Sequence, residues 1–357
     1  MAQLLIDEEI AGYAVLGGAI LGGGGGGSMD GGLKMAKEAQ RLGEIRLIDI
    51  DDIDPEAVLT TCSAVGAPAA RKALAVPDDF IRVVEILLAN GCEPPSGFIS
   101  NECGGGSITN GWLPAAIKGL PVVDALCNGR AHPTGTMGAM GLHKLPGYVS
   151  RQAAAGGSKP EGLYLEMYAA GNIHSASALV RSAADKAGGL VAVARNPVKA
   201  SYVKAYGAVG ALKQAISVGR AVKEAARAGG EKAAHAAASC LYGEILTFGE
   251  VSRVELVTNG GFDAGVVAVD DYEATFWNEY MTLEKGGSRL ATFPDLVTVL
   301  SEEGAPVSTA EIRKGQKVFL LRVPSSKLIL GEGMRCIDLL QSIEPVVGKE
   351  IIKYLAF

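Results

Sequence analysis

Residues 97–126, GFISNECGGGSITNGWLPAAIKGLPVVDAL, combine an apolar strand, a glycine-rich turn, a helical segment and a second apolar strand. The strands are predicted at residues 97–100 and 121–126, and the helix at 107–118. A strand, a helix and another strand in this order are typical of a βαβ unit, in which the two strands run parallel. The stretch therefore predicts an α/β fold with a mainly parallel sheet.

The segments before this stretch repeat the alternation. Asp7 and Asp30 are suited to cap helices, because a carboxylate accepts the free N–H groups of a first helical turn. Gly43 is suited to end the second of these helices. The spacing of apolar residues predicts helices at 10–21, 33–42 and 79–90, and buried strands at 45–50 and 59–65.

The middle of the chain is predicted to be helical around one short strand. Residues 172–186 and 211–227 carry apolar residues at helical spacing, and residues 231–240 continue the helical region. The apolar run at 190–194 predicts a strand. Residues 129–159 are rich in glycine, proline and methionine, so we expect them to be irregular.

The last third of the chain changes to β structure. After Leu241, apolar and polar residues alternate in short runs, which is typical of half-buried strands. Asn259-Gly260 predicts a tight hairpin between strands at 251–257 and 262–269. A further strand is predicted at 318–323, before a final helix at 334–347 that Pro345 interrupts. This part is expected to form an antiparallel β domain.

We therefore predict two domains. Residues 1–168 form an N-terminal α/β domain with glycine-rich loops, and residues 169–357 form a C-terminal domain that is helical at first and then β-rich. The chain of 357 residues is 48% hydrophobic and 20% charged, which is typical of a globular protein.

Charge and cysteine content exclude several classes of protein. The formal net charge is −6 and no Lys/Arg cluster is present, which argues against a nucleic-acid partner. The six cysteines are scattered without a CxxC pair, so they indicate neither a zinc ribbon nor a disulfide framework and favour a reducing cytoplasm. Asp7, Glu8 and Glu9 give the N-terminus the wrong charge for a secretory signal, and no membrane association is expected.

Six consecutive glycines occupy residues 22–27. Ordering them costs roughly 3–6 kcal/mol more than ordering six alanines, so the bare backbone needs a reason. The pattern GxGxxG is satisfied, but the preceding segment is predicted as a helix rather than the strand that a dinucleotide loop requires, and no P-loop GK[ST] follows. Two alternatives remain open, close chain packing and a backbone nest that binds substrate through Gly24, Gly25, Gly26 and Gly27.

The turn at residues 99–106 is a second candidate site. It places Glu102 and three glycines at the carboxyl end of a strand, where α/β folds bind ligands. Glu102 is a candidate general acid or base and Cys103 a candidate nucleophile, with Gly104 and Gly105 as candidate substrate contacts. The alternatives are a solvated loop acid for Glu102 and a small buried hydrophobe for Cys103.

The third candidate site is DALCNGRAHP, residues 124–133. Asp124 lies in an apolar strand, where a carboxylate needs a partner or a chemical purpose, and Arg130 and His132 follow it. These three residues are candidates for a catalytic cluster, while an Asp124–Arg130 ion pair is the structural alternative. Ligand types for a metal are present, but no HxH or HExxH spacing supports one, so no metal site is predicted and no cofactor is indicated.

The ordered series of segments resembles the S-methyl thiohydantoin desulfurase-like family, formerly a domain of unknown function and often found alongside hydantoinases. The resemblance implies an N-terminal α/β domain, a C-terminal β-rich domain and hydrolysis of a hydantoin-like five-membered ring. This chain has Ser28, Leu126 and Thr134 where the family usually has acids. The segments that carry the resemblance are residues 21–27, 66–68, Glu102 with its glycines, 120–133, 215–227, 261–265, 278–279 and 294–296.

Three functional hypotheses follow. The first is a hydrolase of a small hydantoin-like or S-methyl thiohydantoin-like cyclic amide or thioimidate, in which Glu102 or Asp124 transfers protons and Arg130, assisted by His132, stabilises charge. Asn278 is expected to add a polar group to the cleft between the domains. The alternatives are a non-catalytic binding or regulatory subunit of a hydantoinase-type system and a nucleotide-dependent enzyme. The oligomeric state stays open, with a homo-oligomer and a hydantoinase-type partner as candidates.

Overall fold

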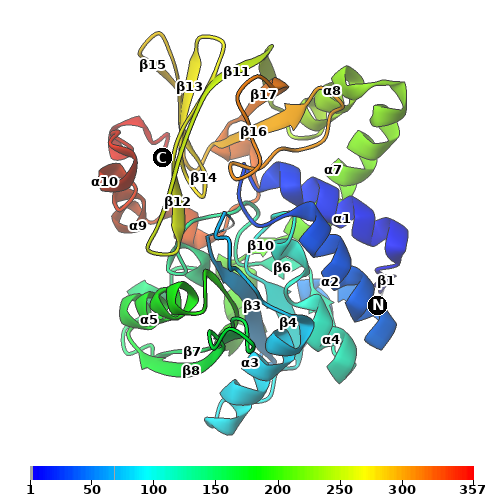
Figure 1. Ribbon diagram of the computed structural model, residues 1–357. Coiled ribbons are helices and arrows are strands. Elements are labelled where there is room, and N and C mark those ends of the chain that lie inside the picture. Colours follow the sequence, from blue (N-terminus) through cyan, green and yellow to red (C-terminus); the bar gives the residue numbers. More distant parts are fainter. Residues whose placement is uncertain (1–2, 68) are drawn as a thin grey trace.

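The computed structural model describes residues 3–67 and 69–357, and its N-terminal part is built on an eight-stranded sheet (Figure 1). The strand order is β1-β2-β5-β4-β3-β9-β7-β8. The bounds are β1 Leu4–Leu5, β2 Arg46–Ile48, β3 Val58–Gly66, β4 Gly97–Ser100, β5 Val122–Val123, β7 Ser150–Gly156, β8 Leu165–Gly171 and β9 Leu190–Lys199.

The α/β fold is confirmed, with one refinement of the sheet. The adjacent strands β2, β5, β4 and β3 are parallel, as the βαβ pattern predicts, whereas β1, β9, β7 and β8 are all paired antiparallel. The sheet is therefore partly rather than mainly parallel, because apolar strand sequences do not reveal their direction. Strand β8 spans residue 168 and β9 follows it, so the sheet draws on both predicted domains.

Helices cover this sheet and connect it to the second part of the molecule. Helix α1 has Asp7 as its N-cap, as predicted, whereas the predicted cap Asp30 is wrong: Ser28 caps α2 and accepts the N–H of Gly31. The predicted helix at 107–118 is divided into a 3-10 turn, η2, and the short helix α4. The bounds are α1 Glu8–Leu21, α2 Met29–Leu42, α3 Pro77–Ala89, η2 Ser107–Thr109, α4 Trp112–Lys118, α5 Ile173–Lys186, α6 Ala200–Tyr206, α7 Ala211–Ala225 and α8 Gly230–Cys240.

Helices α1 and α7 cross at very short distance. A Cβ atom on Gly17 would lie 2.6 Å from the carbonyl carbon of Ala215, and one on Gly219 would lie 2.7 Å from the carbonyl carbon of Tyr13. Only glycine permits this approach of the two backbones. The helix pair lies between the eight-stranded sheet and the C-terminal sheet, and α1 contacts a strand of the latter (Figure 1).

The C-terminal part is an antiparallel half-barrel of seven strands, in the order β15-β14-β13-β12-β11-β17-β16. The predicted hairpin at Asn259-Gly260 is confirmed, because Asn259 pairs with Phe262. No helix among residues 3–67 and 69–357 is long and apolar enough to cross a membrane. The bounds are β11 Glu244–Asn259, β12 Phe262–Val269, β13 Tyr272–Trp277, β14 Glu279–Lys285, β15 Ser288–Thr292, β16 Leu296–Ser301 and β17 Lys317–Val323.

Smaller elements complete the fold and differ in detail from the predictions. The predicted strand at 121–126 is two short strands separated by Asp124, and the second of them, β6, pairs with β10. The segment 129–159 is largely irregular, as expected, but contains β7. The predicted terminal helix is two short helices, α9 and α10, with Pro345 at the start of the second. The bounds are β6 Ala125–Leu126, β10 Ala208–Val209, η4 Leu142–Lys144, η7 Glu332–Arg335, α9 Ile337–Gln341 and α10 Glu344–Val347.

Candidate active site

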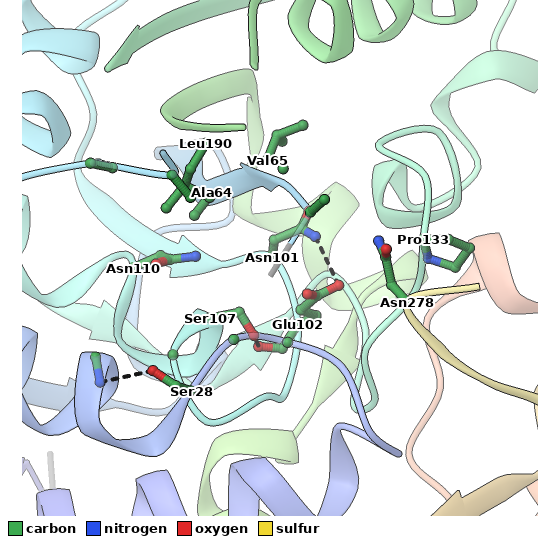
Figure 2. Close-up of a pocket in the computed structure, with 18 of the residues that line it drawn as sticks. Ser28, Ala64, Val65, Asn101, Glu102, Ser107, Asn110, Pro133, Leu190 and Asn278 are labelled. Atoms are coloured by element: carbon green, nitrogen blue, oxygen red, sulfur yellow. Dashed lines mark hydrogen bonds between the residues drawn. The ribbon is translucent and has the colours of Figure 1, made fainter. Parts of the chain in front are cut away.

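A cavity of about 400 Å³ lies between the carboxyl ends of β3 and β4 and the half-barrel. In Figure 2, Ala64, Val65 and Leu190 form an apolar group on one side, with Asn101 and Glu102 at the centre. The volume suits a small organic molecule. The predicted site residues that line it are Gly24, Gly26, Gly27, Glu102, His132 and Asn278.

Glu102 follows β4 directly, which places its carboxyl group at the edge where parallel strands present ligand-binding loops. Its Oε2 atom accepts the backbone N–H of His132 at 3.1 Å and an amide N–H of Asn101 at 3.4 Å. Burial raises the pKa of Glu102 to about 7. This carboxyl group can therefore give or take a proton near neutral pH, as a general acid or base must.

His132 shares this network as a neutral imidazole. Its Nε2 atom lies 2.9 Å from the Asn101 side-chain nitrogen and 3.1 Å from Glu102 Oε2. Burial, together with the charge of Arg195, lowers the pKa of His132 to about 3. A neutral ring accepts a hydrogen bond at Nε2, so a protonated Glu102 has an acceptor for its proton.

Arg195 fixes the orientation of this network from β9. Its Nη2 atom donates to Asn101 Oδ1 at 2.6 Å, which turns the amide nitrogen of Asn101 toward His132 and Glu102. Burial lowers the pKa of Arg195. A charged residue within an apolar strand indicates a site residue, but the predicted strand ends at Ala194, one residue before Arg195.

Arg181 is the second cationic side chain of the cavity. From α5 it donates to the carbonyl oxygens of Gly66 at 3.0 Å, Gly261 at 2.6 Å and Pro133 at 2.8 Å, and its guanidinium lies 3.9 Å from the ring centre of Phe262. Burial lowers its pKa to about 10, so it stays cationic. Arg181 lies within a predicted helix, and the neighbouring residues in the sequence give no indication that it belongs to a site.

Glu279, at the start of β14, is the second carboxyl group of the cavity and is only 2% exposed. Its Oε2 atom has no hydrogen-bond partner within the described part of the chain. Burial, and then the charge of Glu102, raise the pKa of Glu279 well above its ordinary value. The raised pKa favours the protonated form of Glu279, in which its carboxyl group can donate a proton. In the sequence, Glu279 stands out only as part of the segment 278–279 that carries the family resemblance, next to Asn278, the polar residue expected at the cleft.

Four buried polar atoms of cavity-lining residues lack a hydrogen-bond partner within residues 3–67 and 69–357. Two are nitrogen donors, Arg195 Nε and Asn110 Nδ2, and the others are His132 Nδ1 and Glu279 Oε2. Buried polar groups are nearly always paired, so such a concentration at one cavity indicates a polar ligand. Arg195 Nε and Asn110 Nδ2 are donors, and so is Nδ1 of a neutral His132 that accepts at Nε2, so the ligand must offer several hydrogen-bond acceptors.

The six-glycine run forms one wall of this cavity and also packs tightly. A Cβ atom at Gly25 would lie 2.6 Å from Cγ and Cδ of Glu279, and one at Gly26 would lie 2.5 Å from the Cα atom of Gly104. Gly24, Gly26 and Gly27 have positive φ angles of 91°, 77° and 79°. The close packing considered from the sequence is present, and Gly24, Gly26 and Gly27 line the cavity, while substrate binding by their backbone stays a prediction. The run follows α1 rather than a strand, so the strand-turn-helix context of a dinucleotide loop is missing.

Asp124 does not line the cavity. Its Oδ1 atom accepts the backbone N–H groups of Leu212 at 2.9 Å and Lys213 at 3.3 Å, which caps the first turn of α7. The Asp124–Arg130 pair considered from the sequence does not form. Arg130 instead donates to the carbonyl oxygens of Pro294, at 3.1 Å, and Asp295, and lies behind the glycine run rather than in the cavity.

Cys103, Gly104 and Gly105 also lie outside the cavity lining. Cys103 is fully buried near the carbonyl of Ala211, and burial raises the pKa of its thiol, which opposes formation of a nucleophilic thiolate. Cβ atoms on Gly104 and Gly105 would lie 2.6 Å and 2.8 Å from the carbonyl oxygens of Gly26 and Gly27. These residues therefore serve the packing of two glycine loops against each other.

The fold and the cavity define a two-domain α/β protein with a polar site between its sheets. Residues 12–159 match the S-Me-THD-like N-terminal domain and residues 171–337 match the S-Me-THD-like C-terminal domain. The chain belongs to the S-Me-THD-like family. No curated protein matches it.

The fold also occurs in a crystal structure of a protein from Chromobacterium violaceum, with 20% sequence identity and a TM-score of 0.68. The similarity covers 97% of this chain and 96% of that one. It therefore extends over both sheets and supports the arrangement described above.

Proposed function

We propose that this chain is a hydrolase of a small hydantoin-like or S-methyl thiohydantoin-like cyclic amide or thioimidate. The observation that carries the proposal is a set of four polar atoms at the cavity that have no partner among the residues that the structure describes, Arg195 Nε, Asn110 Nδ2, His132 Nδ1 and Glu279 Oε2. Rings of this class present carbonyl acceptors and N–H donors around a small planar frame. The apolar group of Ala64, Val65 and Leu190 suits the face or side chain of such a ring.

Two carboxyl groups with raised pKa values supply the proton transfers that hydrolysis requires. In the first step, ionised Glu102 takes a proton from water as the water oxygen bonds to the thioimidate carbon, and protonated Glu279 gives its proton to the ring nitrogen. In the second step, the added hydroxyl returns a proton to Glu279 as the carbonyl forms. Glu102 then protonates the departing methanethiol, and both carboxyl groups regain their starting states.

Buried cations stabilise the charge that develops during these steps. Arg195 retains Nε as a free donor, and Arg181 stays charged inside the cavity. Donors fixed before the reaction stabilise charge without reorganisation in the transition state. Neutral His132 and Asn101 hold Glu102 in position, because both contact its Oε2 atom.

The experiment is a turnover assay with an S-methyl thiohydantoin, in which released methanethiol is measured with a thiol reagent and the ring product by mass spectrometry. We expect Glu102→Gln and Glu279→Gln to lower kcat by at least about 100-fold, because general acid–base catalysis contributes 10²–10⁴-fold. Glu161→Gln is the matched control, since this glutamate lies on the surface in an ion pair with Lys72.

Full activity in both cavity variants would overturn the assignment of the two carboxyl groups. A folded wild-type protein that binds the ring, releases no product and copurifies with a hydantoinase-type enzyme would instead support the binding-subunit alternative. Ser28, which caps α2, and Thr134, at the cavity, motivate that alternative because the family resemblance implies acids at these two positions.

A further inference from the structure

A second group of side chains with metal-ligand chemistry lies outside the cavity. His143 belongs to the turn η4, while Cys336 and Asp338 lie at the start of α9. One nitrogen, one sulfur and one oxygen from these residues all lie within 4.8 Å of one another. None of the three lines the cavity described above.

A single ion would draw the ligand atoms of this group, which lie within 4.8 Å of one another, to its own spacing. Zinc binds nitrogen, oxygen and sulfur at 2.0–2.3 Å, which places tetrahedral ligand atoms about 3.5 Å apart. His143 Nε2 lies 3.1 Å from Asp338 Oδ2, but the two atoms are not aligned for a hydrogen bond. Such a short, misaligned approach is expected for two ligands that point at a common ion.

The imidazole of His143 is short of partners. Its side chain is only 5% exposed, and neither ring nitrogen has a hydrogen-bond partner within the described part of the chain. The ring of His174 packs edge-on against it, with 5.7 Å between the ring centres, and helps to hold its orientation. An unpaired buried imidazole is costly, and a metal ion would satisfy it.

The neighbouring charges are compatible with a cation at this position. Cys336 is buried, and its Sγ–H group donates to the carbonyl oxygen of Glu332 at 3.3 Å. Because a metal binds the thiolate, this thiol must release its proton to solvent when a metal binds. Lys144 contacts Cys336 and also lies 3.8 Å from Glu332 Oε1. Its half-exposed ammonium group can remain with Glu332 when an ion occupies the site.

We propose that His143, Cys336 and Asp338 bind one zinc-like divalent transition-metal ion, with water as the fourth ligand. Thiolate, imidazole and carboxylate together suit zinc or cobalt and do not suit magnesium or calcium, which prefer oxygen alone. The ion ties η4 to the C-terminal segment, whose residues Met334 and Leu339 pack on Met137 and Trp277. His143 lies far from Cys336 and Asp338 in the sequence, so no short metal-binding motif predicts this group.

Cobalt titration of the metal-free, full-length protein tests this proposal. We expect one equivalent of Co²⁺ to produce a thiolate-to-cobalt charge-transfer band and the strong visible bands of a tetrahedral site, and Zn²⁺ to abolish both. Cys336→Ser should lose the charge-transfer band, and His143→Gln and Asp338→Asn should weaken Co²⁺ binding more than about tenfold. Cys240→Ser is the control, because Cys240 is an exposed free cysteine.

Several outcomes would overturn the proposal. They are the absence of a charge-transfer band in the wild-type protein, an equal band in Cys336→Ser, and loss of the band in Cys240→Ser. Asp338 is exposed, so Asp338→Asn should fold even if Cys336→Ser does not. Unchanged Co²⁺ affinity in folded Asp338→Asn and His143→Gln would also exclude this site.

Discussion

Replacing Gly25 by alanine tests why the six-glycine run is needed. The new Cβ atom would lie 2.6 Å from Cγ and Cδ of Glu279, about 1 Å inside the normal contact distance between carbon atoms. Glu279 is 2% exposed, so its side chain can yield only by turning further into the cavity that it lines. The φ angle of Gly25 is not positive, so backbone strain is not involved. We expect Gly25→Ala to lower the free energy of unfolding by about 1–3 kcal/mol, the usual cost of overpacking.

Chemical denaturation followed by circular dichroism measures this effect, with Gly12→Ala as the control. A Cβ atom at Gly12 in α1 meets no atom of the described residues within 4 Å, so this change should stabilise the protein by about 0.5–1 kcal/mol through helix propensity alone. Adding Glu279→Ala to Gly25→Ala should recover part of the loss, because the side chain in conflict is then removed. Wild-type stability in Gly25→Ala, or no recovery in the double variant, would refute the proposed contact.

Three further predictions concern stability and the assignment of roles. Burial raises the pKa of Glu102 from 4.5 to about 7, so ionisation of this carboxyl group opposes folding. As the pH rises from 4.5 to 7, the free energy of unfolding of the wild-type protein should fall by about 3 kcal/mol relative to that of Glu102→Gln, and parallel stability curves for the two proteins would contradict this. Asp124→Asn keeps the side-chain oxygen that caps α7, so this variant should turn over substrate at the wild-type rate, and loss of activity in the turnover assay would contradict this. Gly17→Ala forces α1 away from α7 and should lower the free energy of unfolding by about 1–3 kcal/mol, whereas an unchanged midpoint of chemical denaturation would exclude the close crossing of the two helices.

The local pattern of the sequence was sufficient to predict the βαβ unit and the hairpin. The apolar runs of β4 and β5 around a helical segment predict parallel neighbours, and Asn259-Gly260 predicts its turn from two residues. The antiparallel pairing of β9 with β3 could not be predicted in the same way. That pairing depends on how α5 returns the chain to the sheet, which no short stretch encodes.

Only the part of the candidate site next to β4 was predictable from the sequence. Glu102 follows directly from the end of β4, where chain direction alone determines its place, whereas the six-glycine run follows α1. Arg195 and Glu279 reach the same cavity from β9 and β14, so their relevance depends on long-range packing. The rule that an acid in an apolar strand needs a purpose applied to Asp124, but the structure supplies backbone N–H groups of α7 as its partners.

The pH dependence of kcat/KM for hydrolysis of an S-methyl thiohydantoin tests the central claim most directly. If Glu102 is the base that activates water, kcat/KM of the wild-type protein should fall below a pH of about 7, where its pKa lies, and this limb should be lost in Glu102→Gln along with most of the activity. A limb near pH 7 that persists in Glu102→Gln, or turnover independent of pH in the wild-type protein, would contradict the role assigned to Glu102.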